Sequence, residues 1–112
     1  MHELAVSRRL VETIEEQAIV HGYASVKTVR LAIGPFTCIE PAALRTSFQI
    51  AAGKSCAAGA LIDIRAAPAD GHCPACGASE AVEDYFATCP ACGAVLDITG
   101  GSDLKIVELE VS

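Results

Sequence analysis

"CPACG" at residues 73–77 returns unchanged as "CPACG" at residues 89–93, and this repeat decides how the second half of the chain folds. Each CxxC pair forms a tight turn that presents two sulfurs on one side. The twelve residues between Cys76 and Cys89 are enough for a short hairpin that brings the two pairs face to face. The glycine after each second cysteine helps backbone amides to turn toward the sulfurs.

Four thiolates brought together in this way match the tetrahedral coordination that zinc prefers. A redox pair or an iron–sulfur site is the alternative, but the symmetric duplication favours structural Zn(II). Such a site has no spare coordination position, which argues against hydrolysis. A module this small has almost no core, so metal binding would supply most of its folding free energy. The predicted zinc ligands are Cys73, Cys76, Cys89 and Cys92.

The remaining cysteines and the neighbouring histidine are not assigned to this site. Each CPACG motif is called a knuckle below. His72 directly precedes the first knuckle and could replace a thiolate, but we interpret it as a solvated residue or a hydrogen-bonding neighbour of a ligand. Cys38 and Cys56 stand alone, and unpaired cysteines are often small buried hydrophobes.

Outward from the knuckles, the composition marks a module inserted into a larger unit. The segment 68–102 is rich in Gly, Pro, Ala and Cys, opens with Pro68 and closes with Gly100-Gly101. We predict a zinc-binding domain over 68–102, and an α/β domain built from 1–67 and 103–112.

The flanking sequence predicts two helices and three strands. Apolar residues at helical spacing indicate a helix over 3–21, and Gly22 can end it in the left-handed conformation. The stripe comprises Leu4, Leu10, Val11, Ile14 and Ala18. A second helix begins at Glu40-Pro41, because proline suits the first helical position.

Alternating patterns predict strands over 25–33, 60–66 and the tail 103–112. In the tail, Val107, Leu109 and Val111 should face the core while Glu108 and Glu110 face water. The expected fold class is α+β, with two helices packed on a three-stranded sheet and an inserted zinc-ribbon-like module.

Charge and hydropathy exclude several classes of protein. The 112 residues carry a net charge of -6, and segment 68–102 holds no Lys or Arg, which argues against nucleic-acid binding. No stretch approaches the ~20 apolar residues of a membrane helix, and charges interrupt any signal-like run near the start. We therefore expect a cytoplasmic location, where thiols stay reduced.

The first three residues, Met-His-Glu, form a potential chelate. A large second residue protects Met1 from removal, so its amine can join the amide and imidazole nitrogens of His2. The amide of Glu3 completes a planar set of nitrogens that suits Ni(II) or Cu(II) and disfavours zinc and magnesium. The alternative is that His2 is an ordinary solvated terminal residue.

Three stretches together resemble the HypA/HybF family of [NiFe]-hydrogenase nickel-incorporation proteins. They are "MHELAVSRRLVETIEEQA", "LAIGPFTCIEPAALRTSF" and the two knuckles, and the match runs in order along essentially the whole chain. The resemblance implies that the α/β domain of 1–67 and 103–112 is the nickel-binding domain. It also implies a chaperone that passes Ni(II) to the hydrogenase large subunit and works with the GTPase HypB.

The resemblance also implies residue roles. His2 matches the family's nickel ligand, Met1 and Glu3 match its neighbours in the start motif, and the four knuckle cysteines match the zinc ligands. Glu40 falls where some relatives carry an acidic residue implicated near nickel, although as the residue before Pro41 it can also simply begin a helix.

Other functions are less compatible with the sequence. No nucleophile–base constellation, phosphate-binding glycine loop or HExxH motif is present, so we do not expect an enzyme. A structural adaptor with an inert His2 remains an alternative that differs only in nickel binding. Both a monomer and a homodimer are compatible with the sequence.

Overall fold

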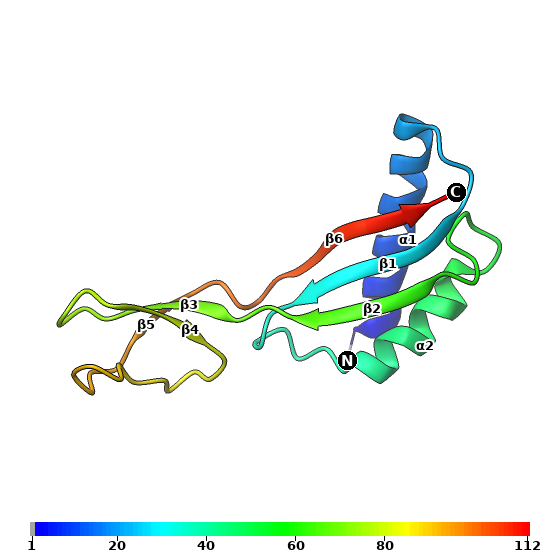
Figure 1. Cartoon of the computed structure of the whole chain (residues 1–112). Helices are drawn as coiled ribbons and strands as arrows, with labels where there is room; N and C mark the ends of the chain where they lie inside the picture. Colours follow the sequence, from blue (N-terminus) through cyan, green and yellow to red (C-terminus); the bar gives the residue numbers. More distant parts are fainter. Residues whose placement is uncertain (1) are drawn as a thin grey trace. The chain divides into compact units, whose positions relative to one another are not determined.

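The computed structural model describes residues 2–112 and has two helices and two small sheets (Figure 1). The elements are α1 (Glu3–His21), β1 (Val26–Ile33), α2 (Pro41–Ala52), β2 (Leu61–Ala66), β3 (Ala69–His72), β4 (Ser79–Val82), β5 (Asp97–Thr99) and β6 (Leu104–Val111). The predicted α+β class, with two helices on a three-stranded sheet, is confirmed. The second sheet, within the inserted segment, was not predicted.

The chain divides into two compact units, each described below by itself. The first unit comprises Met1–Leu31, Cys38–Arg65 and Lys105–Ser112, and the second comprises Ala32–Thr37 and Ala66–Leu104. The division into separate domains at residues 67/68 and 102/103 stays a prediction.

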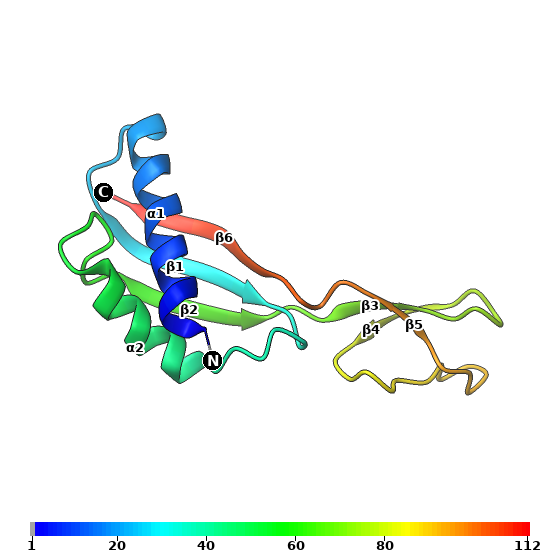
Figure 2. The same ribbon diagram turned by 180° about the vertical axis from the view of Figure 1, so that it is seen from behind.

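The first unit is a layer of helices on a sheet of strand order β2-β1-β6. In Figure 1 the arrows of β1 and β2 point the same way and β6 runs against them. Parallel neighbours need a crossover connection, and α2 supplies it. Seen from behind, α1 and α2 cover the same face of the sheet (Figure 2). The largest fully buried side chains of this layer are Ile14, Val29, Leu31, Leu44 and Phe48.

Helix α1 has the predicted bounds, but its buried face is rotated from the predicted one. Gly22 ends it with φ 73°, and its amide donates to the carbonyl of Ala18 at 2.8 Å. The buried residues are Glu3, Ser7, Leu10, Val11 and Ile14. Leu4 is exposed, so its place in the apolar stripe was wrong. Glu3 takes the inward position because its carboxylate bonds a backbone amide at the start of α2.

Strand β6 lacks the buried face that its alternation predicted. Val107 is 65% exposed, Val111 is also exposed, and no residue of the strand is fully buried. The physical reason is position: β6 is an edge strand, and α1 covers it only in part. An open groove of about 490 Å³ remains between them, lined by Ile14 and Gln17 on one side and Leu109 on the other.

On the other face of this sheet, Arg30 of β1 ties the three strands together. Its guanidinium donates to Glu108 Oε2 at 2.9 Å and to Glu110 Oε2 at 2.8 Å. It also lies 3.4 Å from Asp63 Oδ2 on β2. Partly exposed pairs contribute less than about 1 kcal/mol each. Their main effect is therefore on which strands pair and in which register.

The second unit is built on β3, which pairs antiparallel with β4 and with β5. Gly71 lies at the centre, and a Cβ there would run into Val82 and Leu96, so only glycine lets this face close. The core is small and includes two of the knuckle cysteines. It consists of Ala69, Cys73, Val82, Cys89 and Leu96.

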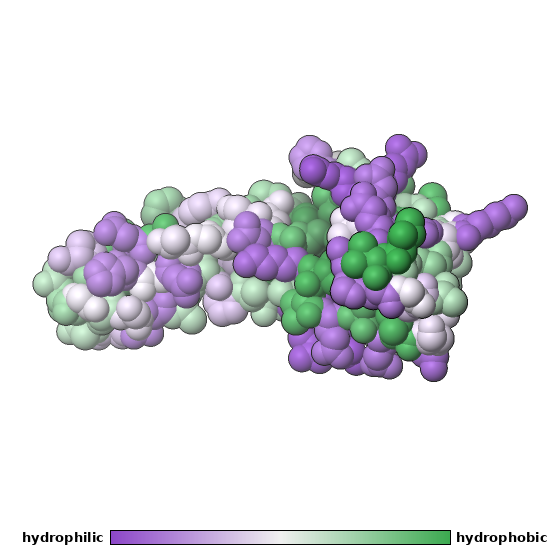
Figure 3. Space-filling model, turned by 90° about the horizontal axis from the view of Figure 1, so that it is seen from above, coloured by the Kyte–Doolittle hydropathy of each residue, from purple (hydrophilic) through white to green (hydrophobic). Residues whose placement is uncertain are grey.

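Hydrophobic side chains also reach the surface. In Figure 3 they are mixed with polar ones on the helix-and-sheet unit. The exposed large apolar residues of the first unit include Ile19, Val20, Ile50, Leu61 and Val107. Within residues 2–112, neither helix combines the length and the apolar character needed to cross a bilayer.

Candidate functional site

The two knuckles have the same backbone geometry, as their identical sequences require. In the first, the amide of Gly77 donates to the carbonyl of Cys73 at 2.9 Å, and Gly77 has φ 79°. In the second, the amide of Gly93 donates to the carbonyl of Cys89 at 2.7 Å, and φ is again 79°. Only glycine adopts this left-handed conformation without strain. The amide of Cys76 also turns toward the Cys73 sulfur, at 3.4 Å.

Each knuckle is the turn of its own β-arm, and this is what brings the two pairs face to face. The first lies between β3 and β4. The second lies between Thr88 and Val95, which form an antiparallel bridge. The predicted meeting of the two pairs is therefore achieved by two arms, not by one hairpin between them.

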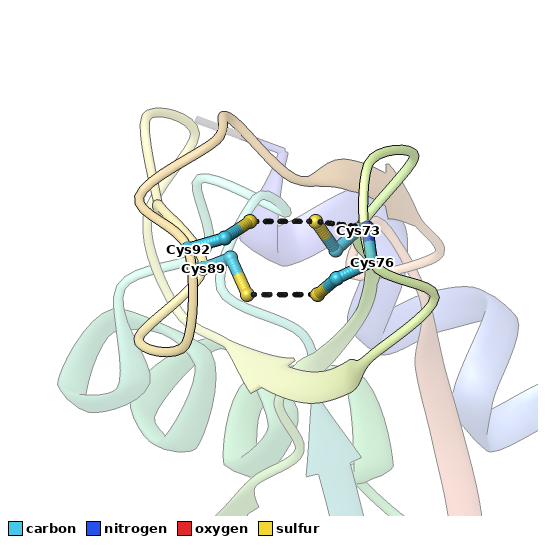
Figure 4. Close-up of side chains that lie close together, drawn as sticks. All are labelled: Cys73, Cys76, Cys89 and Cys92. Atoms are coloured by element: carbon cyan, nitrogen blue, oxygen red, sulfur yellow. Dashed lines mark hydrogen bonds between the residues drawn. The ribbon is translucent and has the colours of Figure 1, made fainter.

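The four sulfurs meet in one cluster (Figure 4). Cys73 Sγ lies 3.4 Å from Cys92 Sγ, and Cys76 Sγ lies 3.6 Å from Cys89 Sγ. All four lie within 4.8 Å of one another. Zinc–sulfur bonds of ~2.3 Å in a tetrahedron would place sulfurs ~3.8 Å apart. The cluster therefore has the donor set and the dimensions of a four-coordinate metal site.

The cluster shifts the pKa values of its own cysteines in opposite directions. The amide of Cys76 donates to the Cys73 sulfur and lowers the pKa of Cys73 to about 6. The amide of Ala78 lowers the pKa of Cys76, but the sulfurs of Cys73 and Cys89 outweigh it and raise that pKa to about 12. Four thiolates at these distances repel one another, and a divalent cation removes that repulsion.

The residues left out of the predicted zinc site lie outside the cluster. His72 is exposed on β3, Cys38 is exposed, and Cys56 is half-buried in the first unit. Burial raises the pKa of Cys56, with Glu15 adding to the effect, so its thiol stays protonated at neutral pH. None of the three joins the group of four sulfurs.

The predicted nickel site begins at the start of α1. His2 is the N-cap residue, but its side chain makes no capping hydrogen bond and is exposed. Its carbonyl accepts from the amide of Val6 at 2.8 Å, which fixes the first turn. The first amides of a helix have no acceptor within the helix. Met1, the other predicted chelating residue at the terminus, lies outside the described residues.

Glu3 and Glu40 come together, although they lie far apart in the sequence. The amide of Glu40 donates to Glu3 Oε2 at 3.2 Å. Among the described residues, the side chains of His2, Glu3 and Glu40 do not form a further group of metal-ligating atoms. The backbone nitrogens of the start motif are therefore needed for a nickel site there.

The carboxylate of Glu40 has a local structural role. Glu40 is the N-cap of α2, and its Oε2 accepts from the amide of Ala43 at 2.9 Å. We expect Glu40→Ala to lower the free energy of unfolding of the first unit by about 1 kcal/mol, as loss of a cap usually does. Urea denaturation followed by circular dichroism measures it. Glu40→Gln keeps an acceptor oxygen and should lose little, so equal losses in both variants would contradict the capping role.

Sequence reasoning missed two contacts that position these sites. The hydrogen bond between Glu3 and Glu40 links residues 37 positions apart, and no local sequence pattern predicts it. The rings of Phe36 and Tyr85 stack in the second unit, with centroids 4.0 Å apart and planes at 23°. The sequence shows that aromatic residues are few, but it does not show which two of them stack.

Two helices on a three-stranded sheet, with two cysteine knuckles converging in a second unit, define a small α+β metal-binding protein. A family model described as "Hydrogenase/urease nickel incorporation, metallochaperone, hypA" matches residues 1–111, and the chain belongs to this HypA family. The resemblance seen in the sequence is confirmed. The family is one of metallochaperones and maturation factors rather than enzymes.

Relatives and solved structures agree with this assignment. The chain is 38% identical over 112 residues to the hydrogenase maturation factor HypA of Azotobacter chroococcum mcd 1, and equally to that of Cereibacter sphaeroides, with 99% of each chain covered. Its fold matches the solution structure of the Ni metallochaperone HypA from Helicobacter pylori with a TM-score of 0.71 at 22% identity, covering 99% of this chain and 97% of the other. At that identity the likeness shows the fold alone.

Proposed function

We propose that this protein is a nickel metallochaperone that binds Ni(II) at its N-terminus and delivers it to the [NiFe]-hydrogenase large subunit. Family membership over the whole chain supports the role in hydrogenase maturation. The observation that carries the site is His2: an exposed imidazole at the start of α1 that takes no part in capping the helix. The side chain is therefore available to a ligand without loss of a structural bond.

The proposed coordination is planar and uses nitrogen atoms. The Met1 amine, the amide and imidazole of His2 and the amide of Glu3 supply four nitrogens in adjacent chelate rings. Ni(II) accepts such square-planar sets, while zinc favours a tetrahedron. The ligands come from the end of a chain, so an acceptor can displace them one at a time. This suits a cargo metal, which must be held specifically and then released.

The second metal in this proposal is a structural Zn(II) held by Cys73, Cys76, Cys89 and Cys92. The sulfur separations support a closed site, because the four thiolates would fill all four coordination positions of a tetrahedral zinc ion. Its chemistry when bound is to neutralise four thiolates and cross-link two β-arms. The chain's own amides, such as that of Cys76, stabilise the thiolates.

The proposed partners follow from the family. They are the GTPase HypB and the hydrogenase large subunit, met in the cytoplasm by a monomer or a homodimer. Any nucleotide hydrolysis then belongs to HypB.

A Ni(II) titration of tag-free, zinc-loaded protein tests the nickel site. The comparison is the same protein with two residues added before Met1, which keeps every side chain but removes the terminal amine from the chelate. We expect the native chain to bind a single nickel ion tightly and the extended chain to lose that binding, as measured by calorimetry.

Two other outcomes would contradict this site. If both proteins bind nickel alike, the terminal amine is dispensable and side chains such as His2 and Glu40 must hold the metal. Glu40→Ala and Glu40→Gln then show whether that carboxylate is a ligand, since both would weaken nickel binding. If neither protein binds nickel, the chaperone proposal fails and an adaptor role replaces it.

A further inference from the structure

The sulfurs that face one another in the cluster belong to different knuckles. Cys73 Sγ lies 3.4 Å from Cys92 Sγ, and Cys76 Sγ lies 3.6 Å from Cys89 Sγ. Figure 4 shows both sulfurs of each knuckle pointing toward the other knuckle. Because a disulfide joins two sulfurs at about 2.05 Å, each facing pair needs to close by only about 1.5 Å. Bonds between the two β-arms are therefore the shortest motion open to these four thiols.

Each facing pair combines one cysteine that solvent reaches with one that it does not. Cys92 and Cys76 are exposed, whereas their respective partners Cys73 and Cys89 are buried. An accessible sulfur beside a second thiol is the arrangement of a redox-sensitive cysteine and its resolving partner. A small oxidant therefore meets Cys92 or Cys76 first, and the buried partner is in place to complete a disulfide.

Disulfides between the facing pairs would join the same two β-arms that a bound metal joins. One knuckle is the turn between β3 and β4, and the other lies between the bridged residues Thr88 and Val95. The facing pairs lie 19 and 13 positions apart in the chain, so their bonds close loops that restrict the unfolded state and stabilise the folded one. A bond within a knuckle would join residues three positions apart and leave the arms unconnected.

We propose that the second unit is a peroxide-responsive switch, which releases its metal and forms the disulfides Cys73–Cys92 and Cys76–Cys89 while its strands stay folded. The proposal rests on the structural Zn(II) of the proposed function. The unit then has two folded forms, one held by metal and the other by disulfides. Thiol reductants and fresh zinc return the second form to the first.

The chemistry balances with two molecules of hydrogen peroxide. The Cys92 thiolate attacks one peroxide oxygen, the O–O bond breaks, and a sulfenic acid and a hydroxide ion form. The Cys73 thiolate then attacks the sulfenic sulfur, which forms the disulfide and releases a second hydroxide ion. A second peroxide molecule oxidises Cys76 and Cys89 in the same way. The four thiolates supply all four electrons, and Zn(II) leaves unchanged because thiolates, not disulfides, are its ligands.

Zinc release is the first readout. The full-length, zinc-loaded chain is treated with hydrogen peroxide, and a chromogenic chelator measures the free zinc. We expect about one zinc ion for every two peroxide molecules consumed, as the steps above require. Cys38→Ser is the matched control, because Cys38 is an exposed thiol outside the cluster and its loss should leave zinc release unchanged.

Peptide mapping identifies the disulfides. The segment between Cys76 and Cys89 contains Glu80 and Glu83, so a glutamate-specific protease cuts the chain between the two knuckles. Disulfides between the arms keep the two resulting peptides joined until they are reduced, whereas disulfides within each knuckle leave them separate. Backbone fragmentation between the two cysteines of each knuckle in the mass spectrometer then assigns every partner.

Amide hydrogen exchange separates a switch from oxidative damage. In the oxidised, zinc-free chain, β3 and β4 should exchange at least about 30-fold more slowly than in the reduced chain whose zinc a chelator has removed, because disulfides of this loop length stabilise a fold appreciably. Incubation with dithiothreitol and zinc should then restore the native zinc content.

Several outcomes would overturn the switch. Disulfides found within the knuckles, or between two chains, would contradict the pairing. Sulfinic acids that dithiothreitol does not reduce would contradict reversibility. Zinc release with loss of protection in β3 and β4 would show damage, and zinc that stays bound while peroxide oxidises Cys38 would show that the cluster does not respond. A native chain that holds no zinc would contradict the proposed structural metal instead, and peptide mapping of that chain would still test the pairing.

Discussion

Replacing Cys76 by serine should unfold the second unit and leave the first one folded. Structural zinc in small modules contributes on the order of 10 kcal/mol to folding, which exceeds the stability of most domains. The second unit has only a small apolar core, and Cys73 and Cys89 are part of it. The first unit has its own apolar core around Leu44 and Phe48, and this core does not depend on a bound metal. Cys76 is exposed, so its loss removes a ligand without leaving a cavity.

Amide hydrogen exchange and zinc analysis check this result together. Protection should vanish across β3, β4 and β5 and persist in α1, α2 and β1, and the zinc content should fall to background. Cys38→Ser is the matched control, because that thiol is exposed in the first unit and lies outside the cluster. A Cys76→Ser protein that keeps a protected second unit without zinc would contradict the structural role of the metal.

Replacing His2 by alanine should weaken nickel binding by at least about 100-fold, because even changes beyond the direct ligands cost metal sites 10–100-fold. The substitution should leave the fold unchanged, since the His2 side chain is exposed and makes no capping hydrogen bond. The free energy of unfolding should therefore stay close to the native value while the affinity for Ni(II) falls. This separation of binding from stability is the signature of a ligand as opposed to a structural residue.

His21→Ala is the control for this experiment. His21 is an exposed histidine at the other end of the same helix, where its Nε2 lies 2.9 Å from Gln17 Oε1. Competition with a coloured chelator measures affinity in each protein, and the absorption spectrum reports a planar nickel site. Equal nickel retention by His2→Ala and the native chain would remove His2 from the site. Equal loss in both histidine variants would point to unspecific binding.

The sequence alone predicted those features that local chemistry determines. The bounds of α1 follow from helical periodicity and from Gly22, which takes the left-handed conformation at its end. Proline at the first position of α2 marked its start correctly. The four-sulfur cluster followed from repeated spacing, because CxxC with a following glycine builds its own turn.

Features that depend on distant partners were not predictable. Glu3 faces inward and Leu4 outward because of an amide 37 positions away. The alternation of β6 was visible, but its burial depended on how far α1 reaches over a sheet edge. Strand β3 contains Gly71, which has little strand propensity and is required only because Val82 and Leu96 pack against it.

The place of β6 in the first sheet has a consequence for how the protein folds. Its bonds to Arg30 span 78 and 80 positions, and the last strand leaves the ribosome after everything it pairs with. Closing a flexible loop of about 40 residues costs about 3 kcal/mol of chain entropy. The pairing of Asp70 with Thr99 brings the two ends of that loop together once the knuckles are closed. Closure of the knuckles therefore shortens the flexible loop that precedes β6, and we expect the first sheet to be completed faster when the four cysteines hold a metal ion.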